Sequence, residues 1–190
     1  MSVDRLYRAA ALSGLLSALV LVSNAGRRAR LLPNAAPLHG IAPLAETFGL
    51  LALTGLYLRH RQSGGALGLA GYATSFVGLS GLLGAEFVIN LIFPAIGTAR
   101  ANVLLHGLTG TVFLVAAVLF LVGTVGFGAA LWRDHVLPRT ATAAYMVGGV
   151  VISLRNVVPV GALVGGLLVA ALGIGWLSVA LARPATPSVS

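Results

Sequence analysis

The sequence contains no cysteine and no lysine, and each absence excludes a class of chemistry. Without cysteine the chain cannot form disulfides, thiolate–metal sites or a thiol nucleophile. Without lysine it cannot form a Schiff base with retinal or pyridoxal phosphate. Charged residues are also scarce, at 8% against about 25% in soluble domains. The chain is therefore predicted to be an integral membrane protein.

The charge that is present is strongly one-sided, because twelve arginines face only four acidic residues and the net charge is +8. The arginines occur in ones to threes, which is typical of helix ends anchored at a lipid surface and not of a nucleic-acid-binding patch. The motifs H-E-x-x-H and G-x-x-x-x-G-K-[ST] are absent, as are a nucleophile elbow and a magnesium-binding aspartate pair. We therefore predict no metal, no cofactor and no nucleic-acid partner.

Apolar runs separated by turns rich in arginine, proline or glycine predict one all-α domain, a polytopic membrane bundle of about six transmembrane helices over residues 1–183. A mobile tail is expected at 184–190. The fourth run is longer than a bilayer requires, so we expect it to bend at Gly123, Gly126 or Gly128. The expected spans are 7–23, 40–58, 66–93, 101–132, 140–158 and 160–182.

Six spans place both termini on one side of the cell membrane. The arginines divide seven to five in favour of the terminal side, which favours cytoplasmic termini. The first span also has the layout of a secretory signal, with Ser23-Asn24-Ala25 as a small-x-small cleavage pattern, so a cleaved first span is the alternative.

A few polar residues lie inside the predicted spans, and we expect them to meet below one bilayer face. Glu86 and Asn90 are one helical turn apart and share a face. Glu46, His106 and Arg155 approach the same bilayer surface from three other spans, and Asn156 follows Arg155. Counting 1.5 Å per residue places Glu46 and Glu86 about 10 Å below that surface. The opposite leaflet is expected to hold nothing comparable, and His60 and His135 on that face are expected to contact lipid headgroups. His39, in the loop on the pocket side, is expected to be solvated.

This convergence predicts a polar pocket for a membrane lipid or an apolar small molecule. An ionisable residue inside a span is costly, and it often marks a functional site. We expect Glu86 to be a general acid and Glu46 its partner base, with Arg155 tuning their charge and Asn90, His106 and Asn156 binding substrate. Alternatively, Arg155 pairs with one glutamate and the network only holds the bundle together.

Two other functions stay open at this point. A proton-coupled carrier would use Glu86 and Glu46 as protonation sites, although carriers bind near the midplane and no inverted repeat is evident. A non-catalytic accessory subunit is the third alternative. Homo-oligomers could form through the glycine-rich faces at Gly64–Gly68 and Gly161–Gly165, although these could equally pack within the chain.

Two passages of the sequence resemble a known group of proteins. They are LALTGLYLRHRQSGGALGLAGY from Leu51 and GAALWRDHVLPRTATAAYMVGG from Gly128. They resemble small multi-pass membrane proteins of high-GC actinobacteria, which implies a six-span bundle and no particular activity. The chain is more faintly similar to the small integral-membrane terpene cyclases, which protonate an isoprenoid alkene or epoxide with acidic residues. That similarity implies that Glu46 and Glu86 are the acidic residues that protonate the substrate. The low aromatic content, 7%, counts against it, because aromatic faces usually guide carbocations.

Overall fold

The computed structural model describes residues 3–33, 35–135 and 137–183, and within them all regular structure is helical. The tail expected at 184–190 lies outside the described residues. The long helices are α1 (Val3–Arg28), α3 (Leu44–His60), α4 (Gly65–Phe87), α7 (Leu108–Asp134), α8 (Arg139–Ser153) and α9 (Val160–Ala182). The short elements are α2 (Ala36–Ile41), the π-helix η1 (Val88–Ile92), α5 (Phe93–Ile96) and α6 (Thr98–Leu105).

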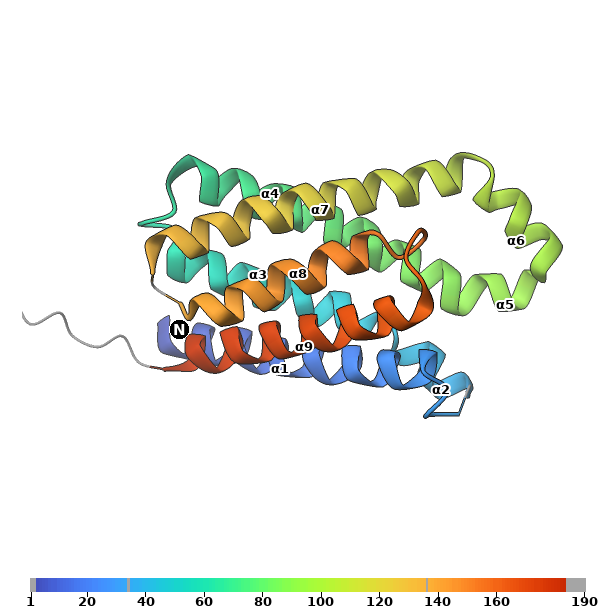
Figure 1. Ribbon diagram of the computed structural model, residues 1–190, viewed down its shortest axis with the longest axis horizontal. Coiled ribbons are helices and arrows are strands. Elements are labelled where there is room, and N and C mark those ends of the chain that lie inside the picture. Colours follow the sequence, from blue (N-terminus) through green and yellow to red (C-terminus); the bar gives the residue numbers. More distant parts are fainter. Residues whose placement is uncertain (1–2, 34, 136, 184–190) are drawn as a thin grey trace, which may run out of the picture.

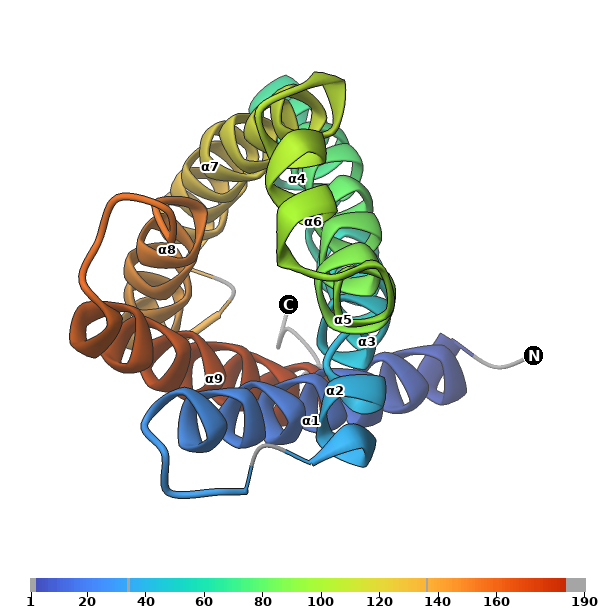
Figure 2. The same cartoon turned by 90° about the vertical axis from the view of Figure 1, so that its right-hand side faces the viewer.

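The six long helices form a closed ring (Figures 1 and 2). Around it, α1 packs on α3, α3 on α4, α4 on α7, α7 on α8, α8 on α9, and α9 returns to α1. The start of α1 and the end of α9 therefore lie at the same end of the bundle, which we call the terminal end. The other end carries α2, α5 and α6. We call it the arginine end after the half-buried Arg27, Arg28 and Arg155 that lie there.

Five helical stretches are long and apolar enough to cross a membrane, which agrees with a multi-pass membrane protein. They run over residues 4–28, 37–60, 65–96, 108–134 and 160–182. The fifth predicted span is shorter than expected, because α8 ends at Ser153 after 15 residues. Its length is about 22 Å, against about 30 Å for the hydrocarbon core. Residues 154–159 form a turn instead, and this turn carries Arg155.

The fourth predicted span is interrupted, but not at Gly123, Gly126 or Gly128. The chain turns at His106 and Gly107, between α6 and α7, and α7 then runs uninterrupted through Gly123, Gly126 and Gly128. The interruption therefore comes before these glycines, and a bend at them stays a prediction. Gly123 and Gly126 lie where α7 approaches α4, and a methyl group at Gly123 would overlap the backbone of Ser75. These glycines permit close packing of the two helices.

The α4–α7 seam uses glycine from both sides. A methyl group at Gly78 would overlap the backbone of Phe120, and one at Gly71 would overlap that of Phe127. Gly64 and Gly68 pack against the His60 ring within the chain. Gly161 and Gly165 face open space, and oligomerisation through them stays a prediction.

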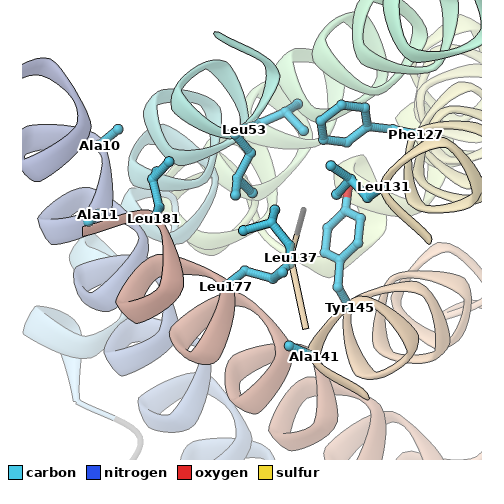
Figure 3. Close-up of a cluster of buried hydrophobic side chains, with 11 residues drawn as sticks. Ala10, Ala11, Leu53, Phe127, Leu131, Leu137, Ala141, Tyr145, Leu177 and Leu181 are labelled. Atoms are coloured by element: carbon cyan, nitrogen blue, oxygen red, sulfur yellow. The ribbon is translucent and has the colours of Figure 1, made fainter. Parts of the chain in front are cut away.

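Toward the terminal end the inside of the ring is filled by packed side chains (Figure 3). Leu53 from α3, Phe127 and Leu131 from α7, and Tyr145 and Leu177 from α8 and α9 converge there. Leu137, which precedes α8, joins them. Phe127, Leu131 and Leu177 are 0–1% exposed. The interior of the ring is thus packed at this end, whereas a cavity lies toward the other.

Candidate functional site

A cavity occupies the interior of the ring toward the arginine end, and all six long helices contribute to its wall. It holds about 900 Å³ not filled by protein atoms, including the part that opens outward. Most of the wall is aliphatic, with Phe120 and Tyr145 as its aromatic members. The polar lining residues are Ser17, Asn24, Arg28, Glu46, Glu86, Tyr145 and Arg155. An apolar chamber with polar groups gathered mainly at one end suits an amphipathic or apolar ligand.

Glu86 is the centre of the polar end and is fully engaged by its neighbours. Its Oε1 accepts a charge-assisted hydrogen bond from Nη1 of Arg155, which also forms an ion pair with it. Its Oε2 accepts a hydrogen bond of 2.8 Å from Nδ2 of Asn90. Glu86 is 6% exposed and Asn90 is 5% exposed. Both oxygens of this buried carboxyl group therefore have hydrogen-bond donors.

The π-helix η1 helps to place Asn90 against Glu86. Asn90 lies in the middle of η1, and its Nδ2 also donates to the backbone carbonyl of Glu86 at 2.9 Å. A π-turn widens the helix and leaves some carbonyls without their usual i+4 amide donor, and such turns are frequent at functional sites. The Asn90 side chain thus satisfies both the carboxylate and the carbonyl of one residue.

The network continues to two residues that the sequence analysis did not place in the site. Nη2 of Arg27 donates to Oδ1 of Asn90 at 3.0 Å, and its Nη1 lies 2.7 Å from Nδ1 of His39. Nδ1 of His39 also lies 3.2 Å from Oδ1 of Asn90, so it accepts from Arg27 in one tautomer and donates to Asn90 in the other. His39 lies in the short helix α2, so the expectation that it is a solvated loop residue was wrong. α1, α2, η1, α4 and the turn after α8 are therefore joined by one chain of polar contacts.

Glu46 differs from Glu86 in having no such support. It lies in the first turn of α3 and lines the cavity. The residue is half-buried as a whole, but its Oε2 is fully buried and has no hydrogen-bond partner among the described residues. No ion pair with Glu46 occurs there either. An unpaired carboxylate in an apolar site is costly, so the neutral acid is its favoured form.

The structure brings together Glu46, Glu86, Asn90 and Arg155, but it leaves His106 and Asn156 outside. His106 caps the end of α6, is exposed, and its Nδ1 lies 2.8 Å from the carbonyl of Asn102 in its own helix. Asn156 is exposed in the turn after α8. Neither lines the cavity. Their predicted positions in the pocket were wrong because the broken fourth span and the early end of α8 turn both side chains outward.

The terminal end holds a second buried polar pair, contrary to expectation. His60 is 0% exposed, and its Nδ1 lies 3.2 Å from Oδ2 of Asp134 at the end of α7. His60 also packs edge-on to Phe127, with the ring centroids 6.3 Å apart. It is therefore not a headgroup contact, whereas His135 is exposed and lies 2.8 Å from Nη2 of Arg139. Neither His60 nor Asp134 lines the cavity.

The chain was compared with protein-family models, with curated proteins and with solved structures. No significant match was found in any of the three, so what the pocket does is inferred from its own residues and geometry.

Proposed function

We propose that this protein is a membrane-embedded acid–base enzyme of the cyclase or isomerase type. Its substrate would be an isoprenoid or another unsaturated lipid that enters the cavity from the bilayer. The observation that carries this proposal is the contrast between the two glutamates. Oε2 of Glu46 is buried at the apolar cavity without a hydrogen-bond partner among the described residues, while Glu86 is paired with Arg155 and hydrogen-bonded to Asn90.

In this mechanism Glu46 is the general acid. Its carboxyl proton is transferred to one carbon of a substrate C=C bond, whose π electrons form the new C–H bond and leave a cation at the other carbon. Attack by a second C=C bond, or migration of the cation, rearranges the skeleton. Loss of a proton from an adjacent carbon to the Glu46 carboxylate then restores both a C=C bond and the acid. No oxidant or further reactant is consumed.

Glu86 would act electrostatically. As an anion near the cavity it stabilises a nearby cation, and its bonds to Arg155 and Asn90 keep it from taking the proton itself. These contacts favour the reverse of the roles expected from the sequence, where Glu86 is the acid and Glu46 the base. Two nearby carboxyl groups in different environments take different protonation states, and here Glu46 is the one without a counter-ion.

The geometry supports the enzyme over the two alternatives. In a carrier, polar groups would be expected to line a path between the two leaflets, but the charged residues among the cavity's described lining all lie at the arginine end. In an accessory subunit, Arg155 would consume the carboxylates and no cavity would be needed. Arg155 engages Glu86 alone, and the cavity is present.

The test is deuterium incorporation by purified protein in lipid nanodiscs. The protein is incubated in D2O with polyprenyl alkenes that carry an anionic head group or none, such as geranylgeranyl phosphate and squalene, and products are analysed by mass spectrometry. An isomer formed by alkene protonation carries one deuterium on carbon. We expect it with the wild type and at least about a hundredfold less with Glu46→Gln, which removes the transferable proton.

The matched control is Asp4→Asn, the same carboxylate-to-amide change at an exposed position at the terminal end. It should convert the probes at the wild-type rate. Equal conversion by Glu46→Gln and the wild type would overturn the assignment of the acid. A wild type that converts none of the probes would overturn the isoprenoid substrate class.

A further inference from the structure

We infer that the polar end of the cavity binds the anionic head of a single-chain amphiphile, and that Arg28 is its direct ligand. The inference names the substrate class of the cavity and in that respect rests on the proposed function. It concerns binding, however, and can be measured without turnover.

Arg28 is a cation that lines the cavity and makes no ion pair with a described residue, although its charge also acts on Glu46. It lies in the last turn of α1, is half-buried, and faces the same space as Glu46 and Glu86. Among the described residues it forms no side-chain hydrogen bond, and the ion pairs found there are Arg155–Glu86 and His60–Asp134. A guanidinium group offers five donors in a planar fork, which matches a carboxylate or a phosphate.

The neighbouring charges favour an anion at this position. Arg27, Arg28 and Arg155 gather around Glu46 and Glu86, and Arg27 lies close enough to Arg28 for their charges to repel. Three guanidinium groups exceed two carboxylates even when both are ionised, and the excess grows when Glu46 keeps its proton. Uncompensated charge is costly in a low-dielectric site, and an anionic head group would offset part or all of it.

Arg28 also differs from the other arginines of this end of the bundle. Arg30 and Arg100 are exposed, as expected of side chains that only anchor helix ends at headgroup level. Arg28 instead lies beside Asn24, a buried amide that also lines the cavity. Asn24 supplies a further donor at the position where a head group would lie.

The shape of the cavity specifies the rest of the ligand. The aliphatic wall extends down α3 from Glu46 to Leu56, ten residues that correspond to about 15 Å of depth. The packed Leu53, Phe127 and Leu177 cluster closes the deep end. A single acyl or prenyl chain fits such a blind chamber, with its head at Arg28 and its tail directed toward the terminal end.

The test measures binding of dodecyl amphiphiles that differ only in the head group, by native mass spectrometry of the full chain released from nanodiscs. The probes are dodecyl phosphate, dodecanoate and dodecanol, with inorganic phosphate as a head group without a tail. We expect the better of the two anionic probes to bind at least about tenfold more tightly than dodecanol, as charge-assisted hydrogen bonds imply. Inorganic phosphate should bind far more weakly than dodecyl phosphate.

Two variants locate the head group. Arg28→Gln should weaken binding of the preferred anionic probe about tenfold and leave binding of dodecanol unchanged. Arg30→Gln, which removes an exposed arginine two residues away, should change neither. Whether phosphate or carboxylate is the natural head group is decided by which of the two probes binds more tightly.

The inference is overturned if the wild type binds dodecanol as tightly as both anionic probes, a result that does not depend on whether any variant folds. It is also overturned if folded Arg28→Gln keeps the wild-type preference, or if inorganic phosphate binds as well as dodecyl phosphate. Selective binding without conversion of polyprenyl probes would refute the proposed reaction alone. Conversion without selective binding would refute this inference alone.

Discussion

The two ends of the bundle each bury a carboxylate beside a basic side chain, but only one of them surrounds space. At the terminal end, His60 and Asp134 are enclosed by packed residues, with Gly64 and Gly68 against the imidazole. At the arginine end, Glu86 and Arg155 form the wall of a cavity, and a second carboxyl group, Glu46, faces it without a partner.

A buried ionisable residue is therefore not by itself a sign of activity. His60–Asp134 joins the end of α3 to the end of α7, and its neighbours leave no room for a ligand. Glu46 has room beside it, and its buried Oε2 has no hydrogen-bond partner among the described residues. Unsatisfied polarity next to empty volume is therefore the property that separates a candidate site from a structural clamp.

The largest expected effect follows from breaking the pair at the arginine end. Glu86→Ala leaves Arg155 as an uncompensated, mostly buried cation, which should lower the free energy of unfolding by about 3–5 kcal/mol. Thermal or SDS titration of the purified protein measures this loss. The double variant Glu86→Ala with Arg155→Ala should recover part of the stability, and a double variant no more stable than the single one would contradict the pairing.

A smaller loss is expected at the terminal end. Asp134→Ala removes the partner of a fully buried imidazole and should cost about 1–2 kcal/mol. The same unfolding titration measures it, together with dodecyl phosphate binding by the folded protein. Binding should stay at the wild-type level, because neither residue touches the cavity. Loss of binding in the folded variant would show that the two ends are coupled.

Two glycines test the difference in packing directly. A methyl group at Gly64 would lie 2.6 Å from Cδ2 of His60, so Gly64→Ala should cost about 1 kcal/mol by overpacking. A methyl group at Gly49, on the cavity wall, would meet Leu79 at 3.4 Å, which is ordinary contact. Gly49→Ala should preserve or slightly raise stability and weaken ligand binding. Similar melting temperatures for both variants would remove the distinction between a packed and an open end.

The smallest effect on stability is expected at Glu46. Glu46→Gln keeps the shape of the side chain and breaks no ion pair among the described residues, so the free energy of unfolding should change by less than about 0.5 kcal/mol. Unfolding curves of the wild type and the variant test this. A loss comparable to that of Glu86→Ala would mean that Glu46 is also held by the protein, and the contrast between the two carboxyl groups would fail.

Much of the fold could be predicted because long apolar runs and their turns are local signals. The pairing of Asn90 with Glu86 also follows from helical spacing, and the hydrogen bond of 2.8 Å confirms that they share a face. His60 was misplaced because its sequence neighbours are arginines. Adjacent helical residues point about 100° apart, so Arg59 and Arg61 say little about the face that His60 occupies.

The rest of the site depends on contacts that no local pattern encodes. Arg27 reaches Asn90 across 63 positions of sequence, and Arg155 reaches Glu86 across 69. The turn at His106 and Gly107 lies between two apolar stretches, and α8 ends at Ser153 in a run that stays apolar from Val150 to Ile152. Their positions are set by how α6 and α8 fit the ring, and so the exclusion of His106 and Asn156 could not be read from composition or spacing.

The closed ring has a consequence for biosynthesis. The first and last helices complete it together, so the chamber does not exist until α9 has been made. Glu86 is translated 69 residues before Arg155, a delay of about 3–14 s at ordinary elongation rates. During that interval the Glu86 carboxylate lacks the Arg155 guanidinium that pairs with it in the folded bundle. The polar end of the cavity is therefore completed only late in translation, once the turn after α8 has been made.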